Sequence, residues 1–282
     1  MIPRIATPSQ TKAILEKHDL YAKKNYGQNF LIECGIVDKI ARHAVISDHC
    51  AVIEIGPGIG ALTQYLCEYA EKVIAFEIDS RLEPVLNENL KDYDNFTLVM
   101  QDFLNTDLTE YIKPLRDEGY DIVVAANLPY YITTPILFRL FEYGETIQAI
   151  TVMMQKEVAD RFGAEVNSKD YNALSVITRY RCEVGKVCKV PANVFQPKPK
   201  VDSAVLQFRF HKEKPLENEA LFFELVKECF RQRRKTLLNN LGNYLGNKQK
   251  AEEIIERAGI KPDARAQSLS LDDFVRLYEV CI

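Results

Sequence analysis

The chain has 282 residues, of which 47% are hydrophobic and 27% are charged, and its formal net charge is −4. This length allows one large domain and a small one, and the composition is that of an ordinary globular protein. No apolar run approaches the roughly 18 to 20 residues of a membrane span, and no apolar stretch follows a basic start as in a signal peptide. We therefore expect a cytoplasmic protein with no membrane association.

The cysteines and histidines argue against two common kinds of site. The seven cysteines are scattered and none lies in a Cys-x-x-Cys pair, so we expect reduced thiols. The four histidines lie too far apart to suggest a zinc site, and no Gly-x-Ser-x-Gly motif is present. We expect neither a metal site nor a serine nucleophile.

Short apolar runs rich in β-branched residues alternate with helical patterns along the first half of the chain. This alternation predicts an α/β fold with a doubly wound, Rossmann-like sheet. The expected strands are residues 51–55, 72–76, 96–100, 121–126 and 149–154, with helices around 62–70 and 82–90. Two further strands are expected at 175–180 and 201–210.

The pattern changes near residues 211–215, where we expect a domain boundary. Residues 1–211 would form the larger domain and residues 212–282 a small helical one. Helical spacing of apolar residues recurs at 221–226 and 251–258. A final helix is expected to begin at the capping pattern of Ser270 to Asp273.

The negative net charge argues against a nucleic-acid partner, but the cations are clustered. Residues 185–201 contain four lysines and no acid, and residues 231–235 add four cations on an expected helix. Such clusters suit phosphate contacts. A solvated helix face is the commoner use of a charge run, so both interpretations stay open here.

The first expected strand leads into Glu-x-Gly-x-Gly-x-Gly at residues 54–60. These glycines let the chain turn tightly under a ligand, although Gly56-x-Gly58-x-x-Ala61 also fits the dinucleotide-binding pattern. Glu77, at the end of the second strand, could bind the ribose of NAD or of S-adenosylmethionine. A nicotinamide dehydrogenase therefore remains an alternative at this point.

Two carboxylates favour S-adenosylmethionine over NAD. The anionic Glu54 would be repelled by a pyrophosphate, whereas it would attract the cationic amino end of a ligand that carries a sulfonium. Asp102, which closes the third strand, can accept a hydrogen bond from an adenine amine.

The fourth strand ends in Asn127-Leu-Pro-Tyr130, a possible holder for a flat base with an exocyclic amine. The Tyr130 ring can stack on the base, and the Asn127 side chain and the Leu128 carbonyl can accept both amine hydrogens. A simple strand exit, in which Pro129 ends the strand, explains the tetrad alone equally well. Placed after acids at three successive strand ends, the tetrad predicts an S-adenosylmethionine-dependent amine methyltransferase.

Eight segments together resemble the ribosomal RNA adenine dimethyltransferase family. They are residues 26–31, 54–63, 77–79, 101–102, 127–135, 154–158, 195–203 and 232–236. The resemblance spans nearly the whole chain. Segments 127–130, 195–203 and 232–236 are more similar to the bacterial enzymes that modify 16S RNA than to the macrolide-resistance enzymes that modify 23S RNA.

The resemblance implies a cofactor site in which Glu77 binds the ribose and Asp102 the adenine of S-adenosylmethionine. The implied cofactor-binding residues are Gln28, Asn29, Leu31, Glu54, Gly56, Gly58, Glu77, Ile78, Asp102, Phe103 and Asn127.

The resemblance also implies a catalytic set, Asn127, Leu128, Pro129, Tyr130 and Phe195. Tyr130 and Phe195 would stack on the target adenine from opposite sides, although a core aromatic is the ordinary use of a phenylalanine such as Phe195. RNA phosphates would be bound by Lys198, Lys200, Arg231, Arg233, Arg234 and Lys235.

The implied activity is dimethylation at N6 of two adjacent adenosines in a hairpin loop near the 3′ end of 16S RNA. The implied partner is the small (30S) ribosomal subunit, with a role in its maturation, and we expect a monomer. Methylation of 23S RNA or of DNA adenine remains an alternative, as does an assembly factor that binds RNA without catalysis.

Overall fold

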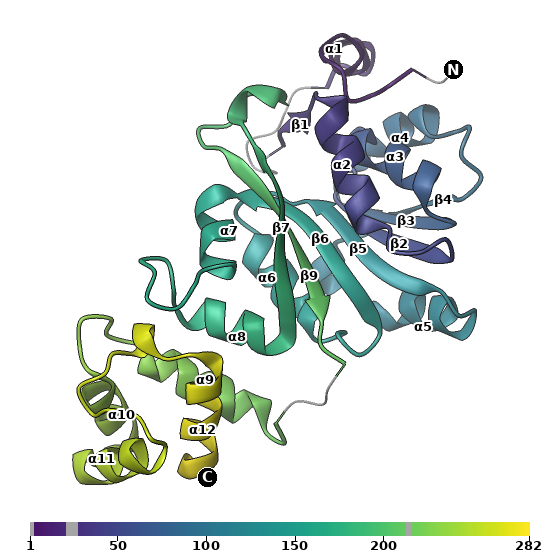
Figure 1. Ribbon diagram of the computed structural model, residues 1–282. Helices are drawn as coiled ribbons and strands as arrows, with labels where there is room; N and C mark the ends of the chain where they lie inside the picture. Colours follow the sequence, from purple (N-terminus) through teal and green to yellow (C-terminus); the bar gives the residue numbers. More distant parts are fainter. Residues whose placement is uncertain (1–2, 21–27, 213–215) are drawn as a thin grey trace. The chain divides into compact units, whose positions relative to one another are not determined.

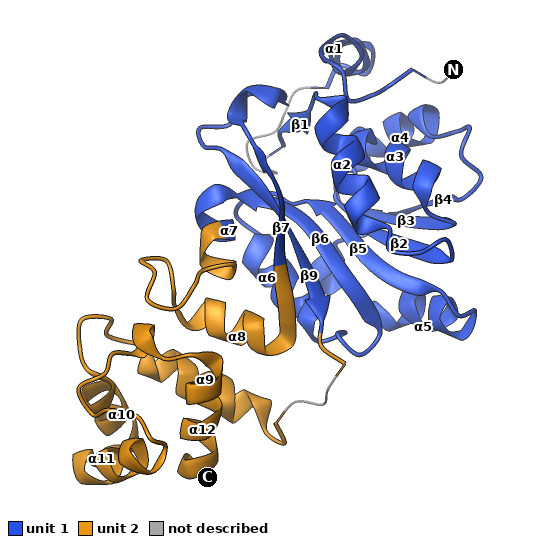
Figure 2. Cartoon of the chain, in the orientation of Figure 1, with its two compact units in different colours: residues 1–159, 185–210 blue, residues 160–184, 211–282 orange. Residues whose placement is uncertain are grey.

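The computed structural model of the chain describes residues 3–20, 28–212 and 216–282. Contacts divide it into two compact units, one of residues 1–159 and 185–210 and the other of residues 160–184 and 211–282 (Figure 2). The segment 21–27, which includes Tyr26 and Gly27 of the resemblance, lies outside the described residues.

The first unit is built on a seven-stranded sheet in the order β4-β3-β2-β5-β6-β9-β7 (Figure 1). The strands are β2 (Cys50–Ile55), β3 (Lys72–Glu77), β4 (Phe96–Met100), β5 (Asp121–Asn127), β6 (Ile147–Gln155), β7 (Cys182–Val190) and β9 (Ser203–Phe210). The strands β2 to β6 pair in parallel, and β9 is antiparallel to β6. The expected doubly wound sheet is confirmed, with β7 as a strand that the sequence did not predict.

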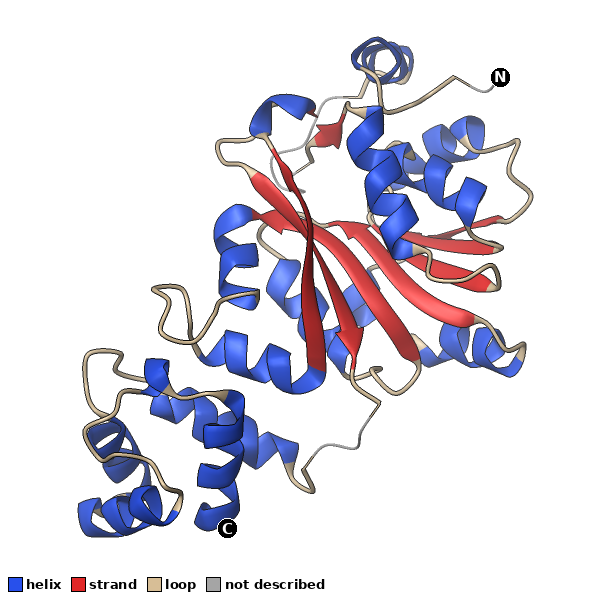
Figure 3. Cartoon of the chain, in the orientation of Figure 1, coloured by secondary structure: helices blue, strands red, loops and turns tan. Residues whose placement is uncertain are grey.

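Helices cover both faces of this sheet (Figure 3). They are α2 (Cys34–Ala44), α3 (Ala61–Tyr69), α4 (Glu83–Asn89), α5 (Thr109–Asp117) and α6 (Thr133–Phe141). Two more helices, α1 (Pro8–Lys17) and α7 (Lys156–Phe162), come before the sheet and directly after β6 in the chain. A separate two-stranded ribbon pairs β1 (Phe30–Leu31) with β8 (Phe195–Gln196). In the part of the chain that the structure describes, no helix is long and apolar enough to cross a membrane.

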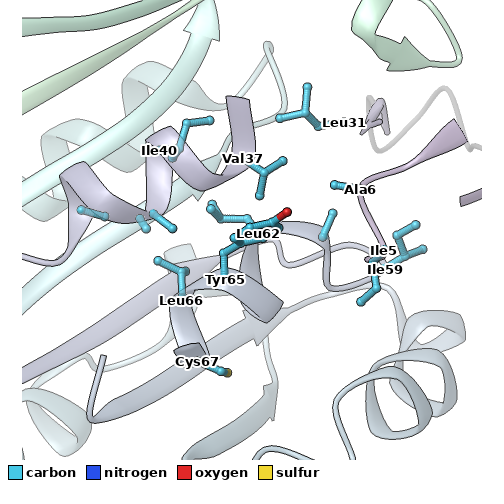
Figure 4. Packing of buried hydrophobic residues seen from close by; sticks show 14 of the residues in the cluster. Ile5, Ala6, Leu31, Val37, Ile40, Ile59, Leu62, Tyr65, Leu66 and Cys67 are labelled. Atoms are coloured by element: carbon cyan, nitrogen blue, oxygen red, sulfur yellow. The ribbon is translucent and has the colours of Figure 1, made fainter. Parts of the chain in front are cut away.

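The apolar strands are explained by burial on two faces. Every residue of β2 is buried. In β5, Val123 and Ala125 belong to the same buried cluster as Val37 of α2, while Ile122 and Val124 point to the opposite face, which α5 covers. Figure 4 shows α2 and α3 meeting in this cluster. The central strands of this three-layer arrangement are buried on both faces, so their residues are mostly apolar and do not alternate between apolar and polar.

The second unit contains α8 (Ala173–Arg181), α9 (Glu219–Cys229), α10 (Leu237–Leu245), α11 (Lys248–Arg257) and α12 (Leu271–Cys281). Residues 160–184 cluster with these C-terminal helices, whereas the sequence grouped them with residues 1–159. The Tyr180 ring lies 4.9 Å from that of Phe222, and the Tyr171 hydroxyl donates a 2.8 Å hydrogen bond to the Leu269 carbonyl. Through these contacts, residues 160–184 form part of the core of the second unit.

The strand expected at residues 175–180 is wrong, because this segment is the helix α8. Its β-branched run from Val176 to Thr178 favours a strand locally. Asn172 and Ser175 form a capping box at the start of the helix, and Val176 and Ile177 are buried on it. Capping and tertiary packing together outweigh the local preference.

The helix expected at residues 231–235 is also wrong, because these residues form the turn between α9 and α10. The buried Asn240 side chain donates to the carbonyls of Cys229, at 2.8 Å, and Gln232, at 3.2 Å, which ends α9 and fastens the turn. Thr236 then caps α10, accepting from the Asn239 amide.

Candidate active site

A cavity of about 300 Å³ opens where β2 and β5 end side by side. The chain leaves β2 toward β3 and β4, whereas β5 leads to β6 on the other side, so the strand order reverses at this point. In open α/β sheets, such a switch point leaves a crevice at the carboxyl ends of the strands, and ligands bind there.

The structure brings every predicted cofactor-binding and catalytic residue to the wall of this one cavity. The set is Gln28, Asn29, Leu31, Glu54, Gly56, Gly58, Glu77, Ile78, Asp102, Phe103, Asn127, Leu128, Pro129, Tyr130 and Phe195. The predicted RNA-binding residues lie elsewhere: Lys198 and Lys200 are exposed between β8 and β9, and the exposed cations of 231–235 belong to the second unit.

The glycine turn after β2 leaves room under the cavity. Gly56, Gly58 and Gly60 have φ values of +70°, +60° and +90°, which side chains rarely adopt. A Cβ atom on Gly56 would meet nothing within 4 Å, whereas one on Gly58 would touch the Phe30 ring at 3.4 Å. The open space at Gly56 is available to a ligand.

The carboxylate of Glu77 is held by three backbone amides. Its Oε1 atom accepts from Ile78 and Asp79, both at 2.9 Å, and Oε2 accepts from Gly58 at 3.2 Å. Burial raises the pKa of Glu77, and these hydrogen bonds oppose that rise. The group joins the glycine turn to the end of β3 and presents a fixed acceptor to the cavity.

Glu54 is buried in the cavity wall without a full set of partners. Its Oε2 atom and the Thr63 hydroxyl make no hydrogen bond of good geometry with the described residues. Burial raises the pKa of Glu54 to about 8, although the nearby Thr63 hydroxyl acts to lower it. The carboxyl therefore holds a proton at neutral pH until a cationic ligand group approaches it.

Asp102 also serves the local fold. Its Oδ1 accepts from the Leu104 amide at 3.0 Å, and its Oδ2 accepts from the Asn105 side chain at 2.7 Å, as in a turn cap. Each carboxylate oxygen has a second lone pair. Asp102 can therefore cap this turn and still accept from an amine in the cavity.

The Asn-Leu-Pro-Tyr tetrad presents two acceptors at the end of β5. The Asn127 amide nitrogen lies 3.4 Å from the Asn29 carbonyl, which directs its Oδ1 away from that carbonyl. The Leu128 amide donates to the Met153 carbonyl at 3.3 Å, and no hydrogen bond from the described residues reaches the Leu128 carbonyl. Both oxygens are thus available to a substrate amine.

The two rings that were predicted to stack on the base, Tyr130 and Phe195, line the same cavity. The half-buried Tyr130 hydroxyl lies 2.9 Å from Ser203 Oγ, the first residue of β9. Phe195 is only 4% exposed, and in the β1–β8 ribbon it pairs with Leu31. Phe195 is therefore a core residue as well as a wall of the cavity, and its stacking on a base stays a prediction.

Sequence reasoning missed Phe30, Met153 and Ser203. Phe30 contacts the glycine turn, Met153 lines the cavity from β6, and Ser203 holds Tyr130. Ser203 lies in the segment 195–203 that carries part of the resemblance. Nothing in the sequence spacing links Ser203 to Tyr130, which lies 73 positions earlier. Such pairs are set by the sheet and not by local pattern.

The chain is similar to named proteins over almost its whole length. A family model described as ribosomal RNA adenine dimethylase matches residues 20–282. A Bacillus pumilus (strain SAFR-032) protein named ribosomal RNA small subunit methyltransferase A is 48% identical, over 98% of this chain and 97% of its own. A Bacillus mycoides (strain KBAB4) protein of the same name is 46% identical, over 99% and 97%.

Solved structures resemble the chain over most of its length. A dimethyladenosine transferase from Plasmodium falciparum superposes with a TM-score of 0.75 at 28% identity, covering 89% of this chain and 98% of that one. The 23S rRNA methyltransferase ErmE gives 0.70 at 30% identity, covering 89% and 99%.

Glu54→Gln should stabilise the ligand-free protein increasingly as pH rises. Below about pH 4 both folded and unfolded states hold the Glu54 proton, and between there and about pH 8 only the folded state does. The wild-type free energy of unfolding therefore falls across this window, whereas the amide does not titrate. Thermal midpoints at pH 5 and pH 8.5 measure the difference, and an equal gap between variant and wild type at both would contradict the buried neutral carboxyl.

Proposed function

This chain belongs to the ribosomal RNA adenine dimethylase family, and we propose that it methylates 16S RNA of the small ribosomal subunit. It is an S-adenosylmethionine-dependent rRNA adenine dimethyltransferase. The proposed targets are the N6 amines of two adjacent adenosines in a hairpin loop near the 3′ end, modified during subunit maturation. The observation that carries the proposal is the pair of available acceptors, Asn127 Oδ1 and the Leu128 carbonyl, beside the Tyr130 ring.

The cavity fits S-adenosylmethionine on three observations. Glu54 offers an unpartnered buried acceptor to the cationic amino end, and Gly56 leaves open space beside it. Glu77 and Asp102 offer fixed acceptors at the ends of β3 and β4 to ribose hydroxyls and to the adenine amine. When bound, the cofactor supplies a methyl group on a positively charged sulfur.

The tetrad would act on the target nitrogen. The lone pair of an adenine amine is delocalised into the ring, so the nitrogen is a poor nucleophile. Two acceptors on its hydrogens favour a pyramidal, electron-rich nitrogen, and these contacts strengthen as positive charge develops there. Tyr130 stacks on the base and keeps the nitrogen in line, and the proton released after alkylation passes to water.

The helical unit would contribute phosphate contacts. In the turn between α9 and α10, Arg231 pairs with Glu228 at 3.0 Å, and Arg233 donates to the Lys169 carbonyl at 2.6 Å. Arg234 and Lys235 are exposed, and no side-chain partner within the described residues engages them. We assign phosphate binding first to Arg234 and Lys235, together with Lys198 and Lys200, and a partly structural role to Arg233.

A second candidate substrate is 23S RNA, favoured by the likeness to ErmE. The relatives at 46–48% identity favour the small subunit, because their names specify it. Mass spectrometry of adenosines after incubation with unmodified small and large subunits separates the two. Dimethyladenosine in the large subunit alone would overturn the proposal, and its absence from both would leave only RNA binding.

Asn127→Ala should lower kcat for methylation by about 100-fold or more, since it removes an acceptor that acts in the transition state. Calorimetry should find the affinity for S-adenosylmethionine within a few fold of wild type. Asn127→Asp, which keeps an acceptor, should retain more activity than the alanine variant. Wild-type turnover in Asn127→Ala would contradict the catalytic role of this side chain.

Ser203→Ala and Tyr130→Phe should each lower kcat about 5- to 10-fold, because each breaks the hydrogen bond that orients the Tyr130 ring. The double variant should be no worse than either single one, since both remove the same interaction. Multiplied losses in the double variant would show that Ser203 does not act through Tyr130.

Arg234→Glu with Lys235→Glu should weaken binding to small subunits, because each substitution removes a cation that neutralises an RNA phosphate. The slope of log affinity against log salt should fall by roughly 1.4, at about 0.7 for each phosphate of a single strand that is no longer neutralised. Lys261→Glu, an exposed loop cation of the same unit, is the matched control. Filter binding over a series of salt concentrations measures the affinity and the slope for the double variant and for the control. An unchanged slope in the double variant would indicate that the turn is a solvated surface that does not contact RNA.

A further inference from the structure

The two tyrosines that follow Pro129 lie in opposite environments. Tyr130 is half-buried and fastened to Ser203, whereas Tyr131 is 63% exposed at the cavity wall. Within the described residues the Tyr131 ring has no hydrogen bond and no aromatic neighbour. Tyr131 is the one aromatic among the exposed large hydrophobic residues of the described chain, which are Ile46, Ile78, Tyr131, Val201 and Ile282.

The backbone fixes where the Tyr131 ring is presented. The Pro129 carbonyl accepts from the Ile132 amide at 3.1 Å and from the Thr133 hydroxyl at 3.2 Å, which closes a tight turn around Tyr131. Thr133 is itself buried as α6 begins. The backbone of Tyr131 is thus fixed at the tip of a hydrogen-bonded turn, whereas its ring is exposed to solvent.

An adenine that enters the cavity leaves a gap in its RNA strand. Its neighbour loses a stacking partner, and this loss adds to the cost of bringing the target base out. Proteins that bind single-stranded RNA commonly replace such stacking with exposed aromatic rings. An aromatic ring one residue beyond Tyr130, at the mouth of the same cavity, is placed to do so.

We propose that Tyr131 stacks on the base next to the target adenosine and so selects targets flanked by an unpaired purine. This inference rests on the proposed RNA methylation and assigns the neighbouring nucleotide of that same substrate. Lys198 and Lys200 are exposed in the loop that follows Phe195, outside the cavity wall, and would bind phosphates of the same strand. Purines are favoured over pyrimidines because they offer the larger face to the ring.

The test compares Tyr131→Ala, Tyr131→Phe and Tyr131→Leu on small subunits in which the nucleotide that flanks the pair of target adenosines is adenine or uracil. On the adenine-flanked substrate, Tyr131→Ala should raise KM about 10-fold, equivalent to about 1.4 kcal/mol, while kcat changes little. The phenylalanine variant should restore wild-type KM, and leucine should not, because it lacks a π-face. Ile46→Ala, an exposed apolar residue outside the cavity wall, is the matched control.

On the uracil-flanked substrate, wild type and Tyr131→Ala should differ less than about 3-fold, because a pyrimidine gains less from the ring. A KM increase of equal size on both substrates would overturn the proposed purine preference, and an unchanged KM on the adenine-flanked substrate would overturn the stacking role. If wild type methylates neither substrate while S-adenosylmethionine still binds by calorimetry, the proposed RNA methylation fails. That result is distinct from failure of the Tyr131 assignment, which requires an active wild type.

Discussion

The parallel pairing of β2 with β5 is the constraint on which the site depends. Ile55 pairs with Ala126, so the glycine turn and the Asn-Leu-Pro-Tyr tetrad leave the sheet at the same level. A shift of one residue would turn every side chain of one strand to the opposite face, and burial on both faces prevents it. The cofactor wall and the substrate wall are therefore aligned by the core itself. The loops add specific groups to this alignment.

Burial of carboxyl groups at that edge of the sheet costs free energy, and the three acids there differ in how many hydrogen bonds compensate for it. Backbone amides hold Glu77, and a backbone amide and the Asn105 side chain hold Asp102, so both remain useful acceptors when no ligand is present. Glu54 is buried with an unpartnered oxygen, and its carboxyl is neutral at pH 7 because desolvation raises its pKa. A cationic group brought next to Glu54 would reverse that balance. Burial of Glu54 without a full set of partners lowers the stability of the ligand-free fold. Pairing of Glu54 with a cationic ligand group would recover this free energy as binding free energy.

Much of this arrangement could be predicted from the sequence. The five parallel strands have the β-branched, uninterrupted apolar runs of doubly buried strands, and acids at successive strand ends converge because parallel strands end at one edge. Residues 175–180 were not predictable in this way, since their helix is set by the Asn172 cap and by packing. The turn at 231–235 depends on the distant amide of Asn240, and the Ser203 contact joins β9 to the end of β5. In each case the missing information is a contact between residues far apart in the chain.

The short ribbon of β1 and β8 has a consequence for the order of events. Leu31, which borders the proposed cofactor side, pairs directly with Phe195, which borders the proposed base side. A two-stranded ribbon contributes little stability alone, and both strands are also held by the buried cluster that contains Phe30, Leu31 and Phe195. A ligand that ordered this cluster from one side would order it for the other, and by thermodynamic reciprocity the two ligands would then raise each other's affinity. Cooperativity between methyl donor and acceptor would follow from two residue pairs, with no movement of the sheet.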